Sequence, residues 1–169
     1  MKKFELTDEF VTNVFGHKLF RIKALVAFGD VEKGELGGFI EKEDNLSHDD
    51  NAWVYGNAQV FGDARVYGNA QVSGNAWVSG NAQVSGNAQV SGNADYAVVA
   101  GFGRYFRTTT FFRCKDKILR VQCGCFYGEL AQFREIVKKT HGDRKYAKEY
   151  LAIADLMELH FSDECGGEQ

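Results

Sequence analysis

The chain has 169 residues and a formal net charge of -3, with 44% hydrophobic, 25% charged and 14% aromatic residues. This length corresponds to one ordinary domain with small appendages. The aromatic content argues against a disordered chain, no apolar run approaches the roughly 18 residues of a membrane span, and a negative charge argues against bulk affinity for duplex nucleic acid or an anionic membrane. Nineteen glycines without a proline indicate many tight corners within regular structure.

Residues 17–28 are the first predicted element. Their apolar residues alternate as in a strand, with Phe20, Ile22 and Ala24 on one side. We expect residues 1–32 to form an N-terminal β cap over the domain that follows, because an uncovered sheet edge is open to pairing with other chains.

A six-residue repeat dominates the middle of the chain. Residues 51–92 contain seven consecutive units of the pattern (N/D)-A-x-V-x-G, and such a repeat outweighs other sequence signals. A weaker frame extends the repeat domain to residues 33–98, eleven units in all. The degenerate outer units include Lys33–Gly38, Asn45–Asp50 and Asn93–Val98, in which Tyr96 takes the valine place.

The unit predicts a short strand followed by a corner. Alanine and valine alternate with outward residues, as in a strand with one buried face, and Gly-Asn tolerates the positive φ that a tight corner needs. About three units then close one coil, and coils stack at about the 4.8 Å strand spacing. The sequence therefore predicts a parallel β-helix of roughly two to four coils. With a period of 18 residues, Gln59 lies beside Trp77, and Trp53 beside Gln71.

Several outward positions of the early units carry large aromatic residues, among them Trp53, Tyr55 and Trp77. An exposed aromatic patch on a neutral surface calls for a cover. We expect contacts in a homo-oligomer or packing of the N-terminal segment to supply it; alternatively, these rings form a shelf for a ligand.

Residues 99–169 are predicted to form an α+β region. Tyr105–Phe112 and Ile118–Gln122 read as the arms of a β-hairpin. Two amphipathic helices are expected at Glu129–Thr140 and at residues 144–161, with Asp143 capping the second.

The stretch Gly101–Arg120 interleaves basic and aromatic residues. Arginines contact phosphate in bidentate fashion, aromatic rings stack on bases, and threonines offer hydroxyls. This mixture predicts a site for a small nucleotide-like anion, although a plain hairpin with its charges in water would show the same alternation. The candidate ligand-binding residues are Arg104, Tyr105, Arg107, Thr109, Arg113, Lys115, Lys117 and Arg120, with Trp53, Tyr55 and Trp77 on the coil.

The repeat, read as V-x-G-(N/D)-A-x, resembles the hexapeptide repeat of left-handed β-helix proteins, with aliphatic Val54 followed four residues later by small Ala58. The whole layout resembles a family of uncharacterised proteins common in phages and prophages of gut-type bacteria. The flanking motifs that carry this likeness are Leu19–Leu25, Gly37–Glu43, Asn45–Ser47, Cys123–Gly128, His141-Gly142 and Tyr146–Tyr150. The resemblance implies a left-handed coil, a homo-oligomer with a trimer favoured, and the cytoplasm of a bacterial host. Four cysteines without a disulfide-rich pattern agree with that reducing compartment.

Hexapeptide β-helices are often acyltransferases, which need a general base such as histidine. Of the four histidines, only His48 falls in the extended repeat frame. The spacing of the histidines does not predict a metal site, and Cys123-Gly-Cys125 is too close for the usual zinc-binding pair, so we expect buried, reduced thiols there. The sequence therefore predicts no catalytic residues, metal or cofactor.

Three functional hypotheses remain. The first is a non-enzymatic phage-type binding protein that sequesters a nucleotide second messenger of bacterial antiviral defence. The second is an acyltransferase-like enzyme that uses His48. The third is a structural or assembly scaffold in which the coil acts as a rigid spacer.

Overall fold

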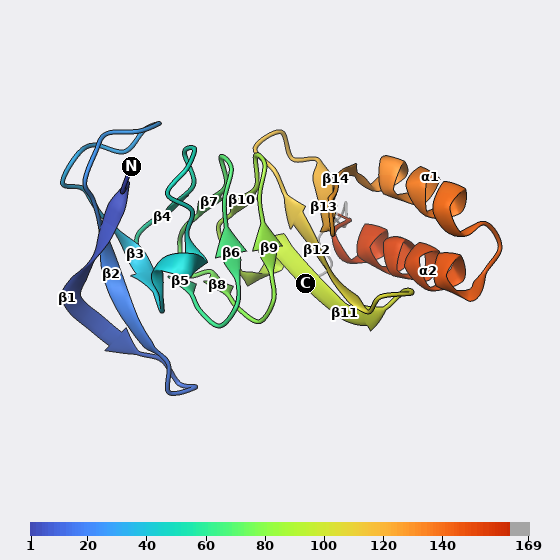
Figure 1. Cartoon of the computed structure of the whole chain (residues 1–169), viewed down its shortest axis with the longest axis horizontal. Coiled ribbons are helices and arrows are strands. Elements are labelled where there is room, and N and C mark those ends of the chain that lie inside the picture. The colour runs from blue at the N-terminus through green and yellow to red at the C-terminus, as the bar shows by residue number, and fades with distance from the viewer. Residues whose placement is uncertain (163–169) are drawn as a thin grey trace, which may run out of the picture.

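The computed structural model describes residues 1–162. Three parts follow one another along the longest axis of the molecule (Figure 1): an N-terminal β-hairpin, a stack of short strands, and a C-terminal sheet with two helices. Along this axis, the repeat domain is the central part.

The seven regular units each form one two-residue strand. These strands are β4 (Trp53–Val54), β5 (Gln59–Val60), β6 (Arg65–Val66), β7 (Gln71–Val72), β8 (Trp77–Val78), β9 (Gln83–Val84) and β10 (Gln89–Val90). They pair in parallel at a spacing of 18 residues, in the orders β4-β7-β10, β5-β8 and β6-β9. The predicted β-solenoid and its period are therefore confirmed.

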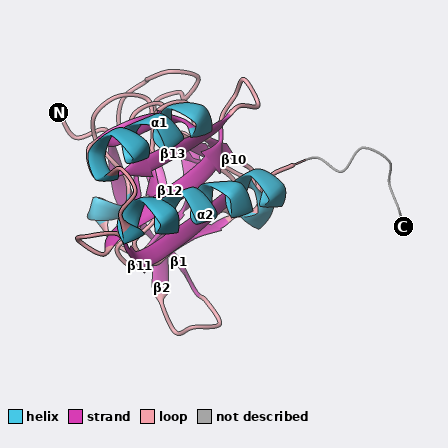
Figure 2. Cartoon of the chain, turned by 90° about the vertical axis from the view of Figure 1, so that its right-hand side faces the viewer, coloured by secondary structure: helices cyan, strands magenta, loops and turns pink. Residues whose placement is uncertain are grey.

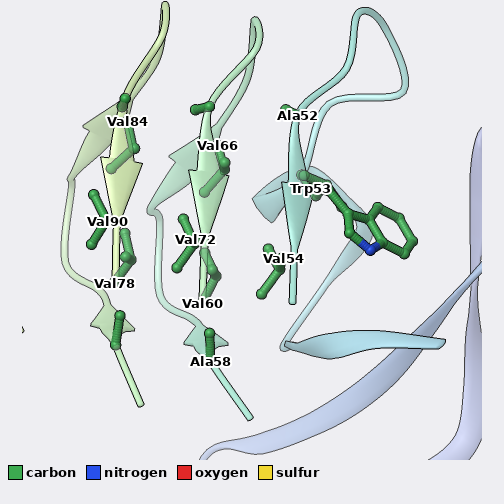
Figure 3. Close-up of a cluster of buried hydrophobic side chains, with 14 of the residues drawn as sticks. Ala52, Trp53, Val54, Ala58, Val60, Val66, Val72, Val78, Val84 and Val90 are labelled. Atoms are coloured by element: carbon green, nitrogen blue, oxygen red, sulfur yellow. The ribbon is translucent and has the colours of Figure 1, made fainter. Parts of the chain in front are cut away.

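The interior of the coil is filled by the small and branched residues of the repeat. Every alanine from Ala52 to Ala88 and every repeat valine from Val54 to Val90 has no exposed surface. Figure 3 shows the valines directed into the coil, whereas Trp53 points away from it toward the N-terminal strands. The alternation of inward and outward residues thus follows the sequence pattern.

The outer units depart from the predicted frame. Ile40 of β3 (Leu36–Ile40) faces Val60 and Leu46 faces Val66, twenty residues ahead instead of eighteen. The two additional residues lie in the corner between Leu46 and β4. Leu36, which the frame assigned to the interior, is 54% exposed and pairs with Lys23.

The last predicted unit does not belong to the coil. Asn93–Asp95 form the 3-10 helix η2, and Tyr96 begins an antiparallel strand instead of taking a valine place. A second short 3-10 helix, η1 (Glu43–Asn45), precedes Leu46 near the other end.

The N-terminal segment forms the antiparallel strands β1 (Phe4–Thr12) and β2 (Lys18–Ala24), which extend the sheet in the order β1-β2-β3-β5-β8. The predicted strand at 17–28 corresponds to β2, whereas β1 was not predicted. Phe4 and Phe28 enclose the ring of Trp53 edge-on. Packing of this segment therefore accounts for the covering of Trp53.

The C-terminal sheet has the antiparallel order β11-β12-β13-β14. Its strands are β11 (Tyr96–Phe102), β12 (Arg107–Arg113), β13 (Leu119–Cys123) and β14 (Phe126–Glu129). The predicted hairpin corresponds to β12 and β13, but β11 and β14 were not predicted. Figure 2 shows the helices α1 (Leu130–His141) and α2 (Lys145–His160) side by side in front of this sheet. The N-cap of α2 is Arg144, so the assignment of this role to Asp143 was wrong.

Side chains of η2 and of the C-terminal sheet form hydrogen bonds with backbone groups of the last strands of the coil. The backbone N–H of Trp77 donates to Asn93 Oδ1 at 2.7 Å, and the Tyr96 hydroxyl donates to the Trp77 carbonyl. The N–H of Gln83 donates to Thr110 Oγ1 at 3.0 Å. These bonds replace those that a further coil would make, and they hold the C-terminal sheet against the repeat domain.

Candidate ligand-binding cleft

A cleft of about 270 Å³ lies where the C-terminal sheet meets the two helices. The β11–β12 turn, the β13–β14 turn and the facing sides of α1 and α2 enclose it. Its lining residues are Arg104, Tyr105, Arg107, Cys123, Cys125, Phe126, Phe133, Ile136, Val137, Thr140, His141 and Tyr150. Three of the predicted site residues, Arg104, Tyr105 and Arg107, are therefore brought together here.

Arg104 and Arg107 both lie against Tyr105. Their guanidinium carbons are 5.4 Å and 5.2 Å from the centre of the Tyr105 ring, within the range of a cation–π contact. Within residues 1–162, neither arginine makes an ion pair with a carboxylate. The mouth of the cleft thus presents two guanidinium groups and one exposed ring.

Two glycines bring the turns close to their neighbours. A Cβ at Gly103 would collide with the Tyr150 hydroxyl, and a Cβ at Gly124 would lie 2.5 Å from Arg107 Nη1. The N–H of Gly103 also donates to Glu149 Oε2 at 2.9 Å. The turn that carries the arginines is therefore fixed to α2.

Aromatic rings form the back of the cleft. Tyr150 meets Phe133 edge-on, with ring centres 5.8 Å apart at 84°, and lies nearly parallel to His141 at 6.0 Å and 27°. Burial first, and the nearby Cys123 thiol second, raise the pKa of Tyr150 to about 12. Its hydroxyl consequently remains protonated at neutral pH, and it donates a hydrogen bond to the Phe102 carbonyl at 3.4 Å.

The other residues of the basic stretch lie elsewhere or are engaged. Thr109 is buried, and its hydroxyl donates to Cys123 Sγ at 3.2 Å. Arg113 lies 3.6 Å from Asp95 and donates to the Phe161 carbonyl. Thr109 therefore has no surface to offer a ligand, and Arg113 does not line the cleft.

The basic residues around the β12–β13 turn are also remote from the cleft. Arg120 makes a bidentate pair with Asp116, at 2.8 and 2.7 Å. Lys115 and Lys117 are exposed in this turn, at the opposite end of β12 from Arg107. The predicted grouping of all six basic residues in one site is thus corrected to Arg104 and Arg107.

The aromatic residues of the coil do not contribute to the cleft. Trp53 has no exposed surface, so its assignment as a ligand contact was wrong. Tyr55 and Trp77 are half-buried. The Tyr55 hydroxyl accepts a hydrogen bond from Gln71 Nε2 at 3.5 Å, and the Trp77 ring packs edge-on against Phe15 with ring centres 5.9 Å apart. Neither lines the cleft.

Sequence reasoning predicted the helices as amphipathic but did not assign their residues to a site, so it missed the lining residues Phe133, Ile136, Val137, Thr140, His141 and Tyr150. Ile136 remains 39% exposed although it lies on the apolar side of α1, because the sheet does not cover that whole face. The free cysteines of the β13–β14 turn also belong here. Cys123 is half-buried and Cys125 is exposed, so the expected burial of the Cys125 thiol was wrong.

A larger hollow of about 420 Å³ lies on the flank of the coil. Its rim carries Asp44, Asp49 and Asp50 together with Arg65. Three carboxylates oppose an anion, so this hollow does not suit the predicted ligand.

His48, the residue singled out for acyl-transfer chemistry, is held against the N-terminal strand. Its ring stacks on Phe4 with centres 4.2 Å apart, and its Nδ1 accepts the Lys3 N–H at 3.1 Å. Burial lowers the pKa of His48. In the described part of the chain, no three His, Cys, Asp or Glu side chains are grouped so as to hold a metal, and no helix is both long and apolar enough to cross a membrane.

Comparison with known proteins adds information on the coil alone. A family model described as YdcK Beta solenoid repeat matches residues 58–74 and 70–86. These segments include β5 to β9. No curated protein matches the chain. The repeat domain is therefore similar to a β-solenoid repeat family, which agrees with its geometry.

Proposed function

We propose that this chain is a non-enzymatic binding protein for a small anionic, nucleotide-like ligand. The observation that carries this proposal is the pair Arg104 and Arg107, both in contact with the ring of Tyr105, at the mouth of a largely apolar cleft. Guanidinium forks bind phosphate, and apolar and aromatic walls accept a base. The lining includes no carboxylate to oppose a negative charge.

The proposed role is sequestration. The phage and prophage resemblance of the sequence supports a protein that withholds a nucleotide second messenger of bacterial antiviral defence, acting in the cytoplasm of the host. Binding without turnover fits a cleft whose lining offers guanidinium groups and aromatic rings.

The proposed architecture is a left-handed parallel β-helix of the hexapeptide type, with residues 1–32 as its N-terminal cap. The V-x-G-(N/D)-A-x pattern supports the hand, and the continuous pairing of β1 and β2 with β3 supports the cap. A homo-oligomer, with a trimer favoured, follows from the same resemblance. Analytical ultracentrifugation measures the oligomeric state.

A thermal-shift screen tests the proposed function. Cyclic di- and trinucleotides, ADP-ribose derivatives and mononucleotides are added to the purified protein, and at least one should raise the melting temperature by mass action. The double variant Arg104→Gln/Arg107→Gln should lose this shift, whereas Lys117→Gln, a matched change in the same basic stretch, should keep it.

The fate of the ligand separates sequestration from catalysis. After denaturation of the complex, mass spectrometry should recover the ligand unchanged. A screen without any stabilising nucleotide would contradict the binding proposal. Consumption of a coenzyme A thioester that disappears in His48→Ala would favour the acyltransferase hypothesis instead.

A further inference from the structure

The volume of the cleft limits the size of its ligand. At about 270 Å³, it lies just below the range of about 300–1,000 Å³ typical of ligand pockets. A space of this size accepts one ring system with a short polar group.

The flat walls favour a planar ligand. Phe126 and His141 remain half-buried and face the cleft, whereas Phe133 and Tyr150 behind them are only 2% and 7% exposed. Aromatic rings associate best through offset-stacked and edge-to-face contacts. A planar ring can make these contacts with several walls, whereas a flexible acyl chain gains nothing from their orientation.

Polar groups interrupt the apolar lining at one side. The Tyr150 hydroxyl already donates to the Phe102 carbonyl at 3.4 Å, which leaves Thr140 and His141 as the polar side chains of the helices that a ligand would cover. A ligand that covered them without hydrogen bonds would leave buried polar groups unsatisfied, which is costly. The edge of a heteroaromatic ring supplies donors and acceptors for such groups, and a hydrocarbon ring does not.

The arginines determine where the charge of the ligand lies. Arg104 lies in the β11–β12 turn and Arg107 begins β12 directly after it, and both side chains contact Tyr105. The bond from Gly103 N–H to Glu149 holds this turn on α2, so the guanidinium groups are positioned before a ligand enters. A phosphate between them would accept hydrogen bonds from both forks.

From these four features, and on the basis of the proposed function, we infer that one cleft binds one mononucleotide unit. Its base lies over Phe126, Ile136 and His141 in the cleft, and its phosphate lies against Arg104 and Arg107. Specificity for a nucleotide over a nucleoside then comes from the arginine turn, and specificity for a base from the helices.

Isothermal titration calorimetry with the full chain tests this assignment. The probes are adenosine and guanosine monophosphates, the matching nucleosides, inorganic phosphate and a cyclic dinucleotide. We expect at least one monophosphate to bind about tenfold or more tightly than its nucleoside and than phosphate alone, because charge-assisted hydrogen bonds to the arginines add to base stacking. The cyclic dinucleotide should bind no better than the monophosphate.

Two variants distinguish the halves of the site. Arg104→Gln/Arg107→Gln should bring monophosphate affinity down to that of the nucleoside while leaving nucleoside binding unchanged. Ile136→Trp, at a partly exposed position that lines the cleft, should weaken both ligands at least tenfold because it fills the space for the base. Lys117→Gln is the control, and circular dichroism verifies that each variant is folded.

The results of these titrations test the mononucleotide assignment, its location in this cleft and the proposed function separately. If a cyclic dinucleotide binds and no monophosphate does, the mononucleotide assignment is overturned and the proposed function stands. If monophosphates bind but the arginine and Ile136 variants have no effect, the assignment to this cleft is overturned. If no nucleotide of any size binds, both the assignment and the proposed function fail.

Discussion

Replacing Gly74 with alanine should destabilise the protein more than the same change at Gly80. Both glycines stand in the local sequence V-S-G-N-A, and their φ angles are +63° and +65°. An alanine in this left-handed region costs about 1–2 kcal/mol. Alanine also reduces the conformational freedom of the unfolded chain, but this contribution is common to both variants and cancels in the comparison.

The two sites differ in what a Cβ would meet. At Gly74 it would collide with the Ser91 carbonyl oxygen of the next coil, whereas at Gly80 nothing lies within 4 Å. Relieving such overpacking adds about 1–3 kcal/mol. We therefore expect a loss of about 1–2 kcal/mol for Gly80→Ala and about 2–5 kcal/mol for Gly74→Ala.

Urea unfolding followed by circular dichroism measures the difference. Gly80→Asn is the control for backbone strain, since asparagine enters the left-handed region more readily than alanine, and it should be less destabilising than Gly80→Ala. Equal losses at the two sites, or a larger loss at Gly80, would refute the stacking of corners deduced for the coil.

Three further predictions concern the stability contributed by a core valine and by the ionisable side chains of Glu41 and Lys3. Val72→Ala should cost about 2 kcal/mol in urea unfolding, from two lost methyl groups plus a cavity, because Val72 is fully buried; outward Gln71→Ala should cost under about 0.5 kcal/mol. The pKa of Glu41 lies below its ordinary 4.5, chiefly because of the hydrogen bond from His17. The stability that the Glu41 carboxylate provides is therefore complete above pH 4.5 and is lost as pH falls through the folded pKa. The difference in melting temperature between the natural protein and Glu41→Gln should accordingly shrink below pH 4.5, and a constant difference would contradict this. Burial lowers the pKa of Lys3 from 10.5 to about 8. Between these two pH values the unfolded chain binds more protons than the folded one, so the free energy of unfolding should rise with pH from 8 to 10.5. Lys3→Met should remove this rise in urea unfolding measured at several pH values, and an unchanged rise would assign it to other groups.

The regular coil was predictable because all seven units share one pattern of buried, outward and corner residues. Alternation fixes which residues are buried, and the glycine fixes the corner, so the pairing Val54–Val72–Val90 follows from the period. The outer frame was not predictable in the same way. Leu36 and Leu46 both fit a degenerate unit, and only the cross-strand register shows that Leu46 lies in the valine ladder while Leu36 is exposed.

The site was only partly predictable for a different physical reason. Six basic residues within 104–120 have similar surroundings in the sequence, but their availability depends on partners that the fold supplies. Arg113 meets Asp95, the last residue of η2. Arg120 meets Asp116 and, across the β13–β14 pair, Glu129. Ion pairing in the fold thus distinguishes Arg113 and Arg120 from the two arginines at the cleft. Affinity for an anion should therefore depend on Arg104 and Arg107 and be insensitive to Lys117, although all three carry the same charge.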